Sequence, residues 1–193
     1  MSHVIWGVVL FGALYPLANG FAKRNWRTYT FSKLPRSIRD GLDSWNSYPA
    51  DKRTTQRIIV LQRIVNYECR RYHVAAFPRV RPAVLKEGTH GIYSHAERTI
   101  SISDTLLNKG ARECVSTVLH EFRHCYQHNI ADMLSTYIPK ESAPVFTEYV
   151  WMQNFMDYKH CTETAESLQQ YYDQPVEVDA RKFARDNIHR YCY

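Results

Sequence analysis

The chain has few of the residues that interrupt regular structure. Its 193 residues include seven glycines and eight prolines, and no segment repeats. Hydrophobic residues make up 45% of the chain and charged residues 23%, which is the composition of an ordinary globular protein and argues against disorder. The length fits one domain with a hydrophobic core of its own.

Cysteine is also scarce, and its pattern argues against a disulfide framework. The five cysteines are Cys69, Cys114, Cys125, Cys161 and Cys192. Their number is odd, and no two of them are spaced as C-x-x-C. This favours reduced thiols in a reducing compartment over a small secreted domain held by disulfides.

Charged residues are absent from residues 3–22, "HVIWGVVLFGALYPLANGFA". About 20 such residues suffice for a helix to span a bilayer. A membrane anchor, a signal peptide and a buried N-terminal helix are all open. We favour the anchor, because the preceding "MSH" lacks the positive charge that usually begins a signal peptide.

Acidic residues are absent between Lys23 and Arg39, where six basic residues lie. The rest of the chain holds 19 basic and 19 acidic residues, so the net charge of +6 and the pI near 9.1 report this one segment. We therefore expect no nucleic-acid partner. Behind an anchor, such a segment predicts a membrane-anchored protein whose folded domain is cytoplasmic, and a secreted or cell-surface location is the alternative.

The remaining sequence predicts an α+β fold that is mostly helical. Hydrophobic spacing indicates a short helix within residues 32–49, a long helix within 51–74, and further helices from Ala111 onward. Between them, alternating β-branched residues predict a small antiparallel sheet with turns near Gly88 and Ala96. The expected organisation is an apolar segment at 1–22, a basic linker with a short helix at 23–50, and the folded domain at 51–193.

A metal-binding pattern lies in "TVLHEFRHCYQHN", residues 117–129. On a helix, His120 and His124 would lie on one face about 6 Å apart along the axis. Both imidazoles can then bind one Zn²⁺, and Glu121 can reach a metal-bound water, as in H-E-x-x-H metallohydrolases. The alternative is two surface histidines on an amphipathic helix. His128 would lie about 12 Å from His120 along the axis, so we expect it outside the ligand set.

A hydrolytic zinc site needs a third protein ligand and leaves its fourth position to water. The candidate is Glu177, in "QPVEVDARKFARDN". It shares a helix face with Ala180 and Ala184, whose small side chains permit close packing against another helix. Asp179 points about 200° away around the helix. Alternatively, Glu177 is an acidic residue favoured at a helix N-terminus by the dipole.

Together, "HEFRH" and "EVDARKFA" resemble the motifs of gluzincin metallopeptidases. They are similar to those of the ImmA/IrrE-type peptidases and of the HtpX and CaaX-prenyl endopeptidase group, over roughly residues 90–184. The resemblance implies a zincin-like fold, with Zn²⁺ bound by His120, His124 and Glu177. It also implies a protein or peptide substrate whose backbone adds to the edge strand of the sheet.

The function expected from this resemblance is zinc-dependent peptide-bond hydrolysis, with Glu121 as general base. Candidates for stabilising the tetrahedral intermediate are Tyr171, Tyr172 and His160. Arg123 either pairs with an acid, contacts substrate or is an exposed helix charge. Two rivals are a catalytically silent zinc-binding regulatory protein and a membrane-tethered interaction protein without metal.

Overall fold

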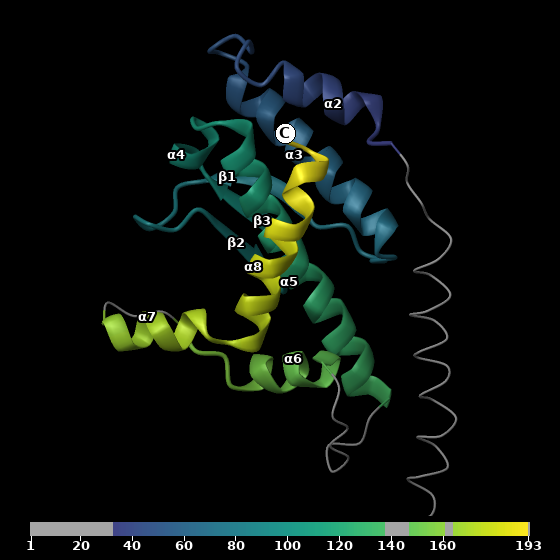
Figure 1. Cartoon of the computed structure of the whole chain (residues 1–193), viewed down its shortest axis with the longest axis vertical. Coiled ribbons are helices and arrows are strands. Elements are labelled where there is room, and N and C mark those ends of the chain that lie inside the picture. Colours follow the sequence, from purple (N-terminus) through teal and green to yellow (C-terminus); the bar gives the residue numbers. More distant parts are fainter. Residues whose placement is uncertain (1–32, 138–146, 161–163, 193) are drawn as a thin grey trace, which may run out of the picture.

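The computed structural model describes residues 33–137, 147–160 and 164–192 (Figure 1). Its helices are α2 (Arg36–Asp43), α3 (Arg53–Arg71), α4 (Asp104–Leu107), α5 (Ala111–Tyr137), α6 (Thr147–Met156), α7 (Ala165–Tyr172), α8 (Pro175–Asn187) and a 3-10 turn, Ile188–Arg190. Its strands are β1 (Arg79–Ala83), β2 (Gly91–Ser94) and β3 (Thr99–Ser103). The predicted α+β class, with mostly helices and a small sheet, is confirmed.

The sheet differs from the prediction in one respect. Its strand order is β1-β3-β2, so β3 lies in the middle. The β2–β3 pair is antiparallel, with its turn at residues 95–98, but β1 pairs with β3 in parallel. The prediction of a purely antiparallel sheet is therefore wrong. The segment between β1 and β2 leaves room for one strand, and β3 lies in that place, between β1 and β2.

Helix α5 is the centre of the fold. It contacts α3, the sheet, α6 and α8 (Figure 1). Val118, Leu119 and Phe122 on α5 are fully buried, because apolar residues at helical spacing give α5 a continuous stripe against its neighbours. All four cysteines in the described ranges are free thiols, in agreement with the reading of the sequence.

Helix α2 packs against α3. Ile38 and Trp45 are each 1% exposed. The buried guanidinium of Arg57 on α3 donates a hydrogen bond of 2.9 Å to the carbonyl of Trp45. This bond connects the residues that follow α2 to α3. Ile38 and Trp45 thus belong to the same hydrophobic core as Val60 and Leu61 on α3.

Within the part of the chain that the structure describes, no helix is long and apolar enough to cross a membrane. This finding contradicts the predicted transmembrane helix and membrane-anchored location as far as the described helices are concerned. Residues 3–22, to which the anchor was assigned, lie outside the described residues.

Candidate metal centre

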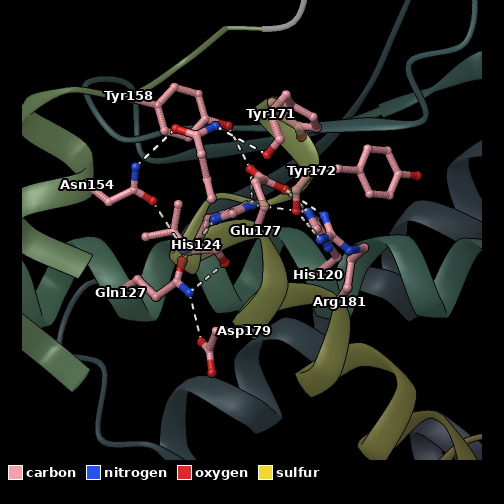
Figure 2. A network of polar contacts seen from close by, with 12 residues as sticks. His120, His124, Gln127, Asn154, Tyr158, Tyr171, Tyr172, Glu177, Asp179 and Arg181 are labelled. Atoms are coloured by element: carbon pink, nitrogen blue, oxygen red, sulfur yellow. Dashed lines mark hydrogen bonds and ion pairs between the residues drawn. The ribbon is translucent and has the colours of Figure 1, made fainter. Parts of the chain in front are cut away.

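The two motif histidines face one point beside α5. The helix runs unbroken from Ala111 to Tyr137, so His120 and His124 lie one turn apart on the same side. Their Nε2 atoms are 3.1 Å apart. Figure 2 shows both imidazoles turned toward Glu177. The first half of the predicted site is therefore in place.

Glu177 is delivered to the same point by α8. Pro175 begins this helix, and Ala180 and Ala184 are buried where α8 lies along α5. The Glu177 side chain is 1% exposed, with Oε2 at 3.3 Å from His120 Nε2 and Oε1 at 3.2 Å from His124 Nε2. The three residues predicted as ligands thus come together, although Glu177 lies far along the chain from the histidines.

The geometry of these three donors fits a small metal ion. Ligand atoms about 2.0–2.1 Å from one tetrahedral Zn²⁺ lie roughly 3.3–3.4 Å apart. The three contacts of 3.1, 3.3 and 3.2 Å are close to that spacing. Among the described residues, this is the group of His, Cys, Asp or Glu side chains that can hold a metal, and no fourth residue joins it. The arrangement leaves one coordination position for water or substrate.

The same contacts set the charge state of Glu177. Burial alone would raise the pKa of its carboxyl group, but the neighbouring imidazoles of His120 and His124 and a hydrogen bond from Tyr158 outweigh it and lower the pKa. Burial of His124 would lower the pKa of its imidazole, but contact with Glu177 raises it. The site therefore holds an ionised carboxylate inside the protein, which is the form that binds a cation.

Glu121 lies between the histidines and strand β2. It is 6% exposed and does not belong to the metal-binding group. A Cβ atom at Gly91 would lie 2.6 Å from Thr117 Cγ2 and 3.0 Å from Glu121 Cγ, so glycine is required for β2 to approach α5 this closely. The Glu121 carboxylate is thereby held at the sheet edge, near enough to His124 for their charges to interact.

His128 lies outside the ligand set, as predicted. Its ring is stacked between Phe155, at 3.7 Å between centroids, and His95, at 4.4 Å. Burial, with smaller contributions from His95 and His124, lowers the pKa of His128 to about 4. A neutral ring stacked on two aromatic rings is a packing element that joins α5 to α6 and to the β2–β3 turn.

Arg123 pairs with an acid, which is one of the three roles considered for it. Its Nε donates to Asp179 Oδ2 at 2.6 Å and its Nη2 to Asp179 Oδ1 at 3.1 Å. The Asp179 side chain is therefore not a metal ligand, as its position around α8 predicted. It does reach α5, however, and joins the two helices that carry the motifs.

Two tyrosines lie close to the Glu177 carboxylate. Of the three residues predicted for the tetrahedral intermediate, Tyr171 lies near Glu177, and burial together with this carboxylate raises the pKa of the Tyr171 hydroxyl. Tyr172 turns away and stacks under Arg181, at 4.3 Å from its guanidinium carbon (Figure 2). His160 is exposed and contacts the ring of Tyr158 at 5.1 Å between centroids.

Tyr158 was not among the site residues predicted from the sequence. Its hydroxyl donates a hydrogen bond of 2.6 Å to Glu177 Oε1. Burial and the neighbouring Glu177 raise the pKa of Tyr158, so the phenol stays protonated and acts as a donor. It comes from the segment after α6, which has no motif. The only signal in the sequence was a tyrosine two residues before His160, and that signal is weak.

We expect Tyr158→Phe to weaken zinc binding by roughly 10–100-fold, because outer hydrogen bonds orient a metal-binding carboxylate. Competition with a chromophoric chelator measures the dissociation constant. Tyr191→Phe is the matched control, since Tyr191 donates to another buried glutamate, Glu68, away from the site. Equal zinc affinities of Tyr158→Phe and the unmodified chain would contradict this role.

Comparison with known proteins gives no relative on which to base an assignment. No protein-family model matches the chain. No curated protein matches it, and no solved structure matches it. The zincin-like fold is therefore not confirmed, and the resemblance to gluzincin metallopeptidases stays a prediction from the two sequence motifs.

Proposed function

We propose that this protein is a zinc-dependent peptidase of the gluzincin type. The observation that carries the proposal is the convergence of Glu177 on His120 and His124, with the Glu121 carboxylate near enough to His124 for their charges to interact. A structural zinc site is normally closed by four protein ligands, whereas a hydrolytic site has three. The described residues supply three.

The strand β2 offers a place for an extended peptide. It pairs with β3 along one edge, and its other edge has no partner strand among the described residues. A peptide backbone can add to such an edge through main-chain hydrogen bonds. Since Gly91 begins β2 and touches Glu121, a peptide on this edge would pass close to the general base.

The roles of the residues follow from their positions. His120, His124 and Glu177 hold the metal ion. Bound zinc supplies a positive charge that lowers the pKa of water and polarises a carbonyl group. Glu121 accepts the proton of the attacking water and returns it to the leaving amine. The hydroxyl of Tyr158 fixes the Glu177 carboxylate, and Tyr171 places a second hydroxyl on the same side of the site.

Removal of the metal tests the proposal. We expect the purified full-length chain to cleave members of a fluorogenic peptide library. A chelator should abolish the cleavage, and Zn²⁺ should restore it after the chelator is removed. Mg²⁺ should not, because it prefers oxygen ligands in octahedral geometry. Cleavage that survives complete metal removal would contradict the proposal. A zinc-loaded chain that cleaves no peptide would favour the catalytically silent, zinc-binding alternative.

A further inference from the structure

A fully buried amide lies directly behind His124. Gln127 is 0% exposed, and its Oε1 lies 2.9 Å from His124 Nδ1. Its Nε2 donates to the carbonyl of Val176 at 2.9 Å and to Asp179 Oδ2 at 2.8 Å. Figure 2 shows Gln127 between His124 on one side and Asp179 on the other. One side chain thus joins the HExxH helix to the helix that carries Glu177.

These contacts determine which way the amide of Gln127 faces. The carbonyl oxygen of Val176 can only accept hydrogen bonds. The –NH₂ group of Gln127 must therefore face Val176 and Asp179, and its oxygen must face His124. The reverse orientation would place the amide oxygen of Gln127 2.8–2.9 Å from two other acceptor oxygens, with no hydrogen between them.

The orientation of Gln127 in turn determines where the proton of His124 lies. Because Gln127 Oε1 is an acceptor, His124 Nδ1 must carry the hydrogen and donate it. The Nε2 atom of the neutral ring then has a free lone pair. That atom faces His120 Nε2 and Glu177 Oε1. This is the tautomer that a metal ligand bound through Nε2 requires.

Asp179 is itself held in place. Arg123 donates hydrogen bonds to both of its carboxylate oxygens. The guanidinium carbon of Arg123 lies 4.7 Å from the ring centroid of Tyr126 and 5.0 Å from that of Trp151. Both oxygens of Asp179 accept hydrogen bonds from Arg123, and Oδ2 also accepts from Gln127 Nε2. The chain of contacts from Arg123 to His124 is fixed at each step.

We propose that Gln127 is a positioning residue for the metal centre, which sets the tautomer and orientation of His124 and is itself oriented by Asp179 and Arg123. The inference rests on the proposed metal site, but it does not require that the protein hydrolyse peptides. A neutral amide at this position adds no negative charge to the two histidines and one glutamate that form the site.

Gln127→Leu tests the proposal, because it keeps approximate volume and removes the acceptor. We expect the zinc dissociation constant, measured by chelator competition, to rise by roughly 10–100-fold. Gln62→Leu is the matched control. Gln62 donates to the carbonyl of Pro78 and accepts from the amide of Val80, so it also joins two elements, but it has no contact with the site. Its loss should leave zinc affinity unchanged.

Gln127→Glu separates positioning from packing. The carboxylate keeps an acceptor for His124 but places an anion against Asp179, so it should lower the melting temperature more than Gln127→Leu. Zinc affinity should follow the opposite order, with Gln127→Glu binding more tightly than Gln127→Leu. If affinity instead follows stability across the two variants, Gln127 is structural and the proposal is overturned.

The tautomer can be read in the unmodified, metal-free chain. Nitrogen-15 NMR at a pH where the ring is neutral should show the hydrogen of His124 on Nδ1. A hydrogen on Nε2 would overturn the proposal, whether or not any variant folds. If the unmodified chain failed to bind zinc, the proposed function would fail, and the NMR result would still decide the orientation of His124.

Discussion

Replacing Glu177 with glutamine should remove zinc from the protein. We expect the unmodified chain to bind one equivalent of Zn²⁺. Loss of a hydrogen bond to a metal ligand lowers metal affinity by roughly 10–100-fold, and Glu177→Gln should lower zinc affinity by more than this. The amide has nearly the shape of the carboxylate and can still accept from the Tyr158 hydroxyl. It supplies no negative charge to the metal, which is why the effect should fall on binding rather than on folding.

The chain contains a matched control for this substitution. Glu68 is also fully buried, at 0% exposed, and also accepts a hydrogen bond from a tyrosine, Tyr191. It contacts Arg71 instead of histidines. Glu68→Gln should therefore cost stability without changing zinc content. Elemental analysis of the two purified variants measures their zinc content and compares the two substitutions. Full zinc occupancy in Glu177→Gln would contradict the assignment of Glu177 as a ligand.

The parts of this site that sequence predicts are those that depend on local spacing. His120 and His124 share a face because they lie one turn apart on α5. The buried side chains of Val118, Leu119 and Phe122 stabilise this helix against its neighbours. Glu177 shares a face with Ala180 in the same way. That the two faces meet was indicated by the small residues on α8, and the contacts of 3.2 and 3.3 Å confirm it.

The parts that sequence missed depend on how elements are placed in space. Tyr158 reaches Glu177 from a segment without periodicity, whose backbone at Lys159 is held by hydrogen bonds to the Gln174 side chain. Asp179 was correctly separated from the ligands, but its link to Gln127 follows from the crossing of α5 and α8. The parallel pairing of β1 with β3 likewise depends on the path of a loop, which alternation within "TISIS" does not encode.

The largest effect on turnover should come from Glu121→Gln. Glu121 is not among the residues that can hold the metal, so the variant should bind zinc with unchanged affinity. Glutamine cannot accept a proton, and loss of a general base typically lowers the rate by about 10²–10⁴-fold. We therefore expect kcat to fall by this amount on any peptide that the unmodified chain cleaves, with KM little changed because the shape of the side chain is retained.

Glu113→Gln is the matched control, since Glu113 is an exposed glutamate in the first turn of the same helix. It should retain full activity and zinc. Zinc content measured on the same samples separates loss of the base from loss of the metal. If Glu121→Gln cleaved as fast as the unmodified chain, another group would have to be the base. If the unmodified chain and Glu121→Gln both bound zinc and neither cleaved peptide, the site would bind metal for a purpose other than hydrolysis. The close approach of β2 to Glu121 at Gly91 would then serve packing alone.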